Sequence, residues 1–435
     1  MRTMKDSGIK WIGQIPESWG VWRMKHLAQS PLQYGANATG IEFDPDLSRY
    51  IRITDITPDR KLSNDGKQSL PETIAKDYFL ENGDILFARS GATSGKSFFY
   101  DDSYGKCCFA GYLIRFRADG RKANSRFLYY YTLTRAYELW TQEIFIQATI
   151  QNISAEKYDN LVFAIPSSLD EQKRIVEYLD SKCSEIDTLI AAKEKTNTLL
   201  RERRQSIIYE AVTKGLDSTA PMKDSGVEWI GEVPETWEIA SLKRLGTPAT
   251  GSTPSKDNPS YWDGAIPWVS SKDMKTDYIL DSEDHITQEA VNDNGLTLFD
   301  PGTLIFCVRS GILRHTFPVT VATVPVTINQ DLRALRLNNK INPSFLLYYM
   351  RGMNDIIVTL YQKIGATVES IEMDWFLYFP VVLPSIREQN DIVSALDNQC
   401  ASLDQTIRQN ETTISQLKEY RQSLIFEAVT GKIEV

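Results

Sequence analysis

The sequence predicts an α+β protein in which two pseudo-two-fold related globular domains are separated by two long antiparallel helices that form a coiled coil. Two observations predict this architecture. The chain repeats itself at an offset of about 218 residues, and each repeat ends in a long proline-free segment with helical periodicity. The 435 residues also exceed the roughly 250–300 residues that one core accommodates, so two or more domains are required.

The repeat is carried by two pairs of matched segments. MKDSGIKWIGQIPESW (4–19) returns as MKDSGVEWIGEVPETW (222–237), and EQKRIVEYLDSKC…RRQSIIYEAVT (171–213) returns as EQNDIVSALDNQC…YRQSLIFEAVT (388–430). A weaker pair is GDILFARSG (83–91) with GTLIFCVRSG (302–311). The segments between these islands differ, so one scaffold carries two variable regions. At the internal boundary the EAVT motif is followed by MKDSG, and the same two motifs lie near the C-terminus and the N-terminus of the chain. We therefore expect the two chain ends to lie close together.

These matches predict four parts of the chain. We expect a first domain at 1–166, a central helix in 167–215, a second domain at 216–384 and a C-terminal helix in 385–435. Within the domains, apolar β-rich runs such as 85–87, 112–116 and 304–306 predict strands, whereas 127–145 and 345–363 predict helices.

The two long segments have the pattern of paired helices. Gly215 and Gly431 follow them, and glycine commonly ends a helix. In the second segment, apolar residues recur at heptad spacing and are interrupted by Asn410 and Arg421. A helix of roughly 44 residues spans about 66 Å and cannot bury such a stripe alone. The duplicate helix is the simplest partner, and the alternative is that each helix folds into the core of its own domain.

Composition excludes several classes of protein. The net charge of −9 is unusual for a DNA-binding protein, although it leaves room for a local basic face. Five cysteines without a spaced framework predict reduced thiols, and three scattered histidines predict no metal cluster. No apolar run approaches the length of a membrane helix, and the start of the chain lacks an apolar signal core. We therefore expect a cytoplasmic protein without a membrane association.

Two segments resemble catalytic or cofactor-binding motifs, but neither has the complete pattern. Residues 91–97 (GATSGKS) resemble a phosphate loop, but three residues separate the glycines where four are needed, and the second copy lacks the motif. Residues 258–261 (NPSY) are similar to the tetrapeptide with which amino-methyltransferases hold a base, yet its third position should be proline and no cofactor-binding glycine motif accompanies it. We therefore expect no catalytic residue, metal or cofactor in this chain.

Order, duplication and motifs together resemble the specificity subunits of type I restriction-modification systems. The resemblance covers essentially the whole chain and is carried by the duplicated S-G-x-x-W-I-G-x-(I/V)-P-x-x-W and by E-Q-x-x-I-V…R-Q-S-(I/L)-I-x-E-A-V-T. GSTPSK (251–256) with YWDGAIPWVSSKDM (261–274), and LQYGAN (32–37), are similar to two different types of recognition domain. The resemblance implies that each variable domain is a target recognition domain for one half of a bipartite, asymmetric site in double-stranded DNA. The helices would be conserved spacers that fix the gap.

The same resemblance implies the partners and their cofactors. Two modification (methyltransferase) subunits would dock on the spacers, carry S-adenosylmethionine and methylate adenine. Restriction subunits would translocate and cut DNA with ATP and Mg, in defence against foreign DNA. The chain itself would be non-catalytic. A fused methyltransferase is one alternative, and a protein-interaction scaffold that does not read DNA is the other.

Candidate DNA-contacting residues lie in loops after apolar strands, where arginine can pair with phosphate or guanine and glycine lets the backbone approach. The first group is Arg89, Ser90, Gly91 and Lys96 in one copy and Arg309, Ser310, Gly311 and Arg314 in the other. The second group is Arg52 and Thr54, beside Asp55, and Ser271 and Lys272, between Ser270 and Asp273. The third is the amide-rich stretch of Gln147, Thr149, Gln151 and Asn152, which could read adenine and which the second copy replaces with Thr367 and Glu369. Structural ion pairs for Arg89 and Arg309, and loop capping for the second group, are the alternatives.

A set of polar residues recurs on the two long helices while its neighbours vary. Recurrence within one chain predicts a shared role, either in pairing the helices or in meeting two copies of one partner. The set consists of Glu171, Gln172, Arg204 and Gln205 on the first helix and Glu388, Gln389, Arg421 and Gln422 on the second, and Glu210 and Glu427 recur in the same way.

Overall fold

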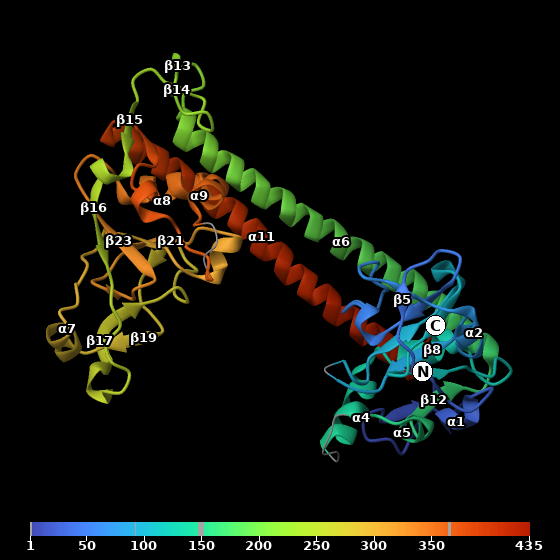
Figure 1. Ribbon diagram of the computed structural model, residues 1–435. Coiled ribbons are helices and arrows are strands. Elements are labelled where there is room, and N and C mark those ends of the chain that lie inside the picture. Colours follow the sequence, from blue (N-terminus) through green and yellow to red (C-terminus); the bar gives the residue numbers. More distant parts are fainter. Residues whose placement is uncertain (1, 92, 147–151, 364–366) are drawn as a thin grey trace. The chain divides into compact units, whose positions relative to one another are not determined.

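The computed structural model describes residues 2–91, 93–146, 152–363 and 367–435. The chain forms two compact units: unit 1 (Met1–Glu194 with Glu411–Val435) and unit 2 (Lys195–Asn410). The long helices α6 (Leu169–Lys214) and α11 (Ile386–Val429) each contribute residues to both units (Figure 1). Each unit is thus built from most of one copy of the repeat together with part of the long helix of the other copy.

Unit 1 contains short sheets and helices in an α+β arrangement. Its strands are β1 (Met4–Asp6), β2 (Gln14–Pro16), β3 (Trp19–Arg23), β4 (Gln33–Tyr34), β5 (Ile41–Glu42), β6 (Ser48–Ile51), β7 (Gln68–Leu70), β8 (Ile85–Ala88), β9 (Ser97–Phe99), β10 (Cys107–Phe109), β11 (Leu113–Phe116) and β12 (Val162–Pro166). Its shorter helices are α1 (Met24–Leu27), η1 (Ile53–Asp55), α2 (Glu72–Ala75), η2 (Lys76–Tyr78), η3 (Asp102–Tyr104), α3 (Ser125–Tyr131), α4 (Arg135–Ile146) and α5 (Ala155–Asp159). The two larger sheets have the orders β4-β11-β8-β9 and β10-β6-β7-β5, and β3 pairs antiparallel with β12.

Unit 2 repeats this plan with different sheets. Its strands are β13 (Met222–Asp224), β14 (Glu232–Pro234), β15 (Glu238–Ser241), β16 (Gly246–Thr250), β17 (Trp262–Val269), β18 (Tyr278–Ile279), β19 (Asp284–Ile286), β20 (Leu304–Cys307), β21 (Val319–Ala322), β22 (Thr327–Ile328), β23 (Leu332–Leu337) and β24 (Pro380–Leu383). Its shorter helices are η4 (Leu242–Arg244), η5 (Pro259–Tyr261), α7 (Gln288–Asp293), η6 (Gly311–Arg314), α8 (Pro343–Gly352), α9 (Asn354–Tyr361) and α10 (Met373–Phe376). The larger sheets have the orders β16-β23-β20-β21-β18 and β19-β17-β22, and β15 pairs with β24.

The two helices predicted at 127–145 and 345–363 are each broken in two. The first divides into α3 and α4 at Thr132, whose hydroxyl donates to the Tyr129 carbonyl oxygen (2.6 Å) and lies 2.7 Å from the Ser97 hydroxyl. The second divides at Met353, where the side chain of the next residue, Asn354, accepts the backbone N–H of Phe317 (2.7 Å). A polar side chain with a partner in another segment lies at each break, and periodicity along the chain does not reveal such a contact.

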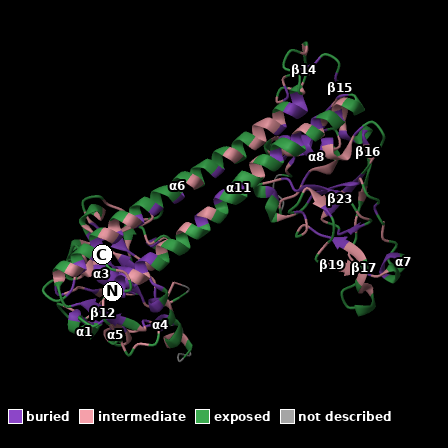
Figure 2. Cartoon of the chain, turned by 180° about the vertical axis from the view of Figure 1, so that it is seen from behind, coloured by how far each residue is buried: buried purple, intermediate pink, exposed green. Residues whose placement is uncertain are grey.

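The long helices pair antiparallel within each unit, as the sequence predicts. In unit 1, Asp187 and Glu194 of α6 form ion pairs with Arg421 (3.1 Å) and Lys418 (3.6 Å) of α11. The later residue of α6, Glu194, pairs with the earlier residue of α11, Lys418, so the two helices run antiparallel. Buried residues recur along both helices between exposed ones (Figure 2), so their apolar stripes are covered by each other and by the globular bodies.

Unit 2 contains the same antiparallel pairing, and a buried polar pair lies in the seam between its two helices. Arg204 of α6 lies 3.1 Å from Asp404 of α11. Beyond this ion pair, where unit 2 ends, the buried Asn410 donates its side-chain N–H to the side-chain oxygen of buried Asn197 (2.9 Å). Asn410, which the sequence shows as an interruption of the heptads, is therefore satisfied inside the seam. A buried asparagine of this kind fixes helix register at some cost in stability.

The opening motif of each repeat covers the end of a long helix. Trp19 and Trp237 are fully buried, and their indole N–H groups donate to Glu171 (3.1 Å) and Glu388 (2.9 Å). The prediction that the chain ends meet is confirmed within unit 1, where Arg2 forms an ion pair with Glu434 (3.6 Å; Figure 1). No helix in the described ranges is both long and apolar enough to cross a membrane.

Candidate nucleic-acid interface

In unit 1, the first group of candidate residues forms a tight loop after β8. The Ser94 N–H donates to the Gly91 carbonyl oxygen (2.9 Å), and the Ser94 hydroxyl donates to the Arg89 carbonyl oxygen (3.0 Å). Gly91 has a φ of 78° and open space where a Cβ would lie, so the backbone there is accessible to a ligand. Lys96 turns back into the protein, where its ammonium donates to the Thr57 carbonyl oxygen (3.4 Å). Burial, followed by the nearby Arg60, lowers the pKa of Lys96.

Arg89 is held by stacking rather than by an ion pair. Its guanidinium lies over the Tyr34 ring, 4.8 Å from the ring centroid, and its Nε is buried without a hydrogen-bond partner. The Tyr34 hydroxyl in turn accepts the Ala155 N–H (3.0 Å) at the start of α5. Among the described residues Arg89 forms no ion pair. The remaining guanidinium donors are therefore left for a ligand, in an orientation that the tyrosine fixes.

In unit 2, the corresponding loop follows β20 and begins a 3₁₀ turn. The Ser310 side chain accepts the Ile312 N–H (3.4 Å) and so caps η6. Arg314 forms an ion pair with Glu369, and the hydrogen bond from Arg314 lowers the pKa of that carboxyl group. Arg309 is exposed and makes no ion pair within the described part of the chain. The alternative that Arg89 and Arg309 are structural ion-pair residues thus finds no support in either unit.

Each of the two loops is joined to the segment that follows the two short helices of its unit, α3 and α4 in unit 1 and α8 and α9 in unit 2. Ser90 bridges to Asn152, and the Ile153 N–H donates to the Arg89 carbonyl oxygen (2.9 Å). In unit 2, Arg309 bridges to Ser370, and the Ser310 N–H donates to the Glu369 carbonyl oxygen (3.0 Å). The fold therefore brings the first and third candidate groups together in each unit. Gln147, Thr149 and Gln151 lie outside the described residues.

The second group of candidates is largely occupied in holding its own loops. Arg52 donates to the Asp55 carboxylate through Nε (3.1 Å) and a terminal nitrogen (2.7 Å), and also to the Gly66 carbonyl oxygen (2.7 Å). The hydrogen bond that Arg52 donates to Asp55 raises the pKa of Arg52. Thr54 remains exposed between them. The loop-capping alternative therefore describes Arg52 and Asp55.

The equivalent loop of unit 2 is capped in the same way. The Asp273 carboxylate accepts the backbone N–H (2.8 Å) and the hydroxyl (3.0 Å) of Ser270, and also the Glu283 N–H (2.8 Å). Lys272 is exposed and Ser271 is half-buried at the tip of the turn. The side chains of Ser271 and Lys272, between the two capping positions, take no part in these capping bonds.

The prediction that Gln172 and Gln389 pair the helices or meet a partner is wrong. Both side chains are fully buried, and each joins its long helix to the globular body of its own unit. Gln172 accepts the Asn124 N–H (2.7 Å) and donates to the Pro166 carbonyl oxygen (2.9 Å), and Gln389 makes the same two contacts with Asn342 (2.7 Å) and Pro384 (2.9 Å). A buried amide must find such partners, so its recurrence reflects folding.

Glu171 and Glu388 also bond to the body of their own unit rather than to the other long helix, and a partner contact by either one stays a prediction. Each carboxylate accepts the indole N–H of the tryptophan in the opening motif, and Glu171 also forms an ion pair with Arg2 (2.6 Å). Neither contact involves the other long helix.

The remaining recurrent residues divide between three environments. Arg204 and Arg421 do pair the helices, through their contacts with Asp404 and Asp187. Gln205 instead donates to the Arg351 (2.9 Å) and Gly352 (3.1 Å) carbonyl oxygens at the end of α8. Gln422 is exposed, and a partner contact there stays a prediction.

The comparison with known families decides what this duplicated arrangement is. The model of the type I restriction modification DNA specificity domain matches the chain twice, at residues 42–198 and 234–419. The chain belongs to the type I DNA specificity family. The specificity subunit of EcoR124I/EcoR124II from Escherichia coli is 32% identical over 231 residues, which are 53% of this chain and 52% of that protein. The match thus spans about half the length of that relative.

Other members of the specificity family match over nearly the whole chain. The putative MjaX specificity subunit of Methanocaldococcus jannaschii is 24% identical over 435 residues, 98% of this chain and 96% of that protein. A solved structure from work on complex assembly and conformational transition of the type I R-M system covers 96% of this chain and 99% of its own, with a TM-score of 0.73 and 16% identity. The HsdS subunit from Thermoanaerobacter tengcongensis covers 96% and 98%, with a TM-score of 0.52 and 16% identity. At these identities the structural likenesses establish the fold alone.

Tyr34 lies in the LQYGAN segment (32–37), but the sequence did not reveal its contact with Arg89. It belongs to β4, which pairs with β11, and β11 pairs in turn with β8 immediately before Arg89. Two successive strand pairings bring residues 55 positions apart into contact. The available signal was an aromatic residue in a short strand, which becomes informative only once the sheet order is known.

Proposed function

We propose that this chain is the non-catalytic DNA-specificity subunit of a type I restriction-modification enzyme. Each unit reads one half of a bipartite, asymmetric site in double-stranded DNA. The observation that carries the proposal is the Arg-Ser-Gly loop, which both units share. Each unit holds this loop against the segment that follows its two short helices, α3 and α4 or α8 and α9, but the residues around the loop differ between the units. Arg89 is stacked on Tyr34, whereas Arg309 is exposed beside the Arg314–Glu369 ion pair. The two units share a scaffold, but the residues around their loops differ, so we expect the two units to read different half-sites.

The chemistry of the loops supports contact with DNA. A guanidinium whose donors are free can bond a phosphate or both acceptors of a guanine edge, and glycine allows close approach of the backbone. The net charge of −9 means that the chain alone has little non-specific attraction for DNA. In this proposal two modification subunits supply further cations together with S-adenosylmethionine, and restriction subunits supply the chemistry that needs ATP and Mg, all in the cytoplasm.

Methylation mapping tests this function directly. The full chain would be co-expressed with the modification subunits of its own system in a methylation-free host, and methylated adenines located by single-molecule sequencing. We expect one asymmetric motif of two short half-sites and a fixed gap. Absence of a motif in this assembled system, or a continuous motif without a gap, would contradict the proposal and favour the scaffold alternative.

Conservative arginine variants assign the half-sites to the units. R89K and R309K keep the charge but lose the planar donor pair, so a base contact should weaken by about 1–3 kcal/mol while a phosphate contact survives. We expect each variant to relax one position in only one half-site. R135K is the matched control, because Arg135 is an exposed arginine of unit 1 that pairs with Glu138 (2.8 Å) on its own helix. Unchanged motifs in both loop variants would remove these arginines from the reading surface.

A further inference from the structure

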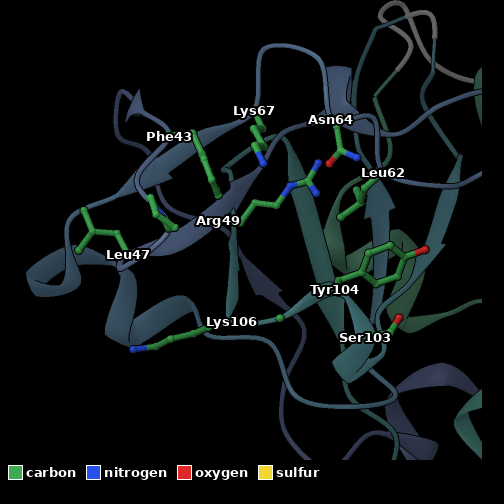
Figure 3. A pocket seen from close by; sticks show the side chains of 11 residues that line it. Phe43, Leu47, Arg49, Leu62, Asn64, Lys67, Ser103, Tyr104 and Lys106 are labelled. Carbon is green, nitrogen blue, oxygen red and sulfur yellow. The ribbon is translucent and has the colours of Figure 1, made fainter.

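A basic pocket in unit 1 is separate from the Arg-Ser-Gly loop. It has a volume of about 440 Å³ and lies at the sheet of order β10-β6-β7-β5. Its lining includes Arg49, Lys67 and Asn64 together with the rings of Phe43 and Tyr104 (Figure 3). None of the lining residues is an aspartate or a glutamate, although the chain as a whole is acidic.

Strand register places the two cations on one face of the sheet. Arg49 of β6 pairs with Ser69 of β7, and Lys67 lies two residues before Ser69. Residues opposite each other in an antiparallel pair share a face, and so do residues two apart, so Lys67 and Arg49 point the same way. Figure 3 shows both nitrogen groups at the same side of the pocket, with the Asn64 amide turned toward Arg49.

Neither of the two cations forms an ion pair in the described part of the chain. Arg49 donates one terminal nitrogen to the Ser63 carbonyl oxygen, and its Nε is buried without a hydrogen-bond partner. The Lys67 ammonium lies over the Phe43 ring, 3.8 Å from its centroid. Lys106 differs from both, because its ammonium forms an ion pair with Glu72 (2.7 Å) and extends away from the pocket (Figure 3). Two neighbouring cations without a carboxylate are stabilised by an anion.

We propose that this pocket binds a phosphate group. Arg49, Lys67 and Asn64 supply the donors, and the rings of Phe43 and Tyr104 offer apolar walls for the sugar or base attached to it. The pocket adjoins the Arg52–Asp55 loop, since Arg52 donates to the carbonyl oxygen of Gly66, the residue before Lys67. Resting on the proposed function, the phosphate belongs to the backbone of the target duplex, and a free nucleotide is the other source of the same chemistry.

Two substitutions compare the unpaired Lys67 ammonium in the pocket with the paired Lys106 ammonium, which is directed away from it. K67Q removes the unpaired ammonium, whereas K106Q is the matched control that removes an equal charge directed at Glu72. Circular dichroism melts would first establish that both variants fold as the unaltered chain does. In the first arm, the full chain is titrated with inorganic phosphate and with AMP by calorimetry. In the second, the complex with its modification subunits is titrated with duplex DNA of the mapped motif at several salt concentrations.

The two arms distinguish the sources of the phosphate. If the pocket binds a backbone phosphate, K67Q should reduce by about one the size of the negative slope of log binding constant against log salt concentration. It should also weaken binding equally for all DNA sequences, while K106Q leaves the slope unchanged. For a free nucleotide, K67Q should weaken AMP binding roughly tenfold without a change in the slope. Binding of phosphate, AMP and duplex by K67Q as by the unaltered chain would overturn the pocket. Failure of the assembled complex to bind any duplex would instead overturn the proposed function, and the first arm would then decide the pocket alone.

Discussion

The buried glutamine near the start of each long helix offers the sharpest test of how the scaffold is held together. In unit 1, the Gln172 amide accepts the Asn124 N–H and donates to the Pro166 carbonyl oxygen, with a longer contact to the Lys122 carbonyl oxygen (3.5 Å). Asn124 is also the N-cap residue of α3. The glutamine thus ties the long helix to the helix that packs on it.

We expect Q172L to destabilise unit 1 substantially. Leucine has a similar volume but leaves the Asn124 N–H and the Pro166 carbonyl group buried without partners. Each unsatisfied buried group costs about 1–3 kcal/mol, which gives roughly 2–4 kcal/mol for the pair once the apolar gain of leucine is included. For a unit of this size, that corresponds to a fall in Tm of roughly 5–15 °C.

Thermal unfolding followed by circular dichroism measures this effect. Q389L makes the same change in unit 2 and should cost a similar amount, since Gln389 has the same partners there. Q422L is the control on an exposed position of α11, where we expect a change within about 0.5 kcal/mol. If Q172L melted within a degree of the unaltered chain, the argument that these amides hold the helices to the bodies would be refuted.

Three further predictions follow from the helices and the thiols. Deleting one heptad from each helix, residues 188–194 with 414–420, removes about 10 Å of helix and should shorten the gap in the methylated motif by about three base pairs without altering either half-site; a constant gap in methylation mapping would reject this. Replacing both Asn197 and Asn410 with leucine should raise Tm by a few degrees in a thermal melt, because an apolar pair replaces a buried polar one; a lower Tm would show that the bond between them is net stabilising. The five cysteines are free and buried, and burial raises the pKa of Cys107 to about 12, so that thiol stays protonated at pH 8; we expect slow reaction with a colorimetric disulfide reagent until denaturant is added, and a fast phase in the native protein would contradict it.

The sequence by itself determined the plan of this protein. The duplication, the extent of the two long helices and the meeting of the chain ends all follow from patterns along the chain, namely matched motifs, heptad spacing and terminating glycines. The antiparallel pairing followed as well, because an amphipathic helix of this length needs a partner and the repeat supplied one. Local capping and periodicity are properties of neighbouring residues, so they can be recognised without coordinates.

Only the tertiary structure decided which polar residues do what. Gln172 and Arg204 look alike as recurrent helix residues, yet one is buried against its own globular body and the other faces the second helix. Tyr34 reaches Arg89 across two strand pairings, and Lys67 joins Arg49 through the register of β6 with β7. Such contacts depend on sheet order and strand register, which are set by the packing of distant segments rather than by the residues on either side.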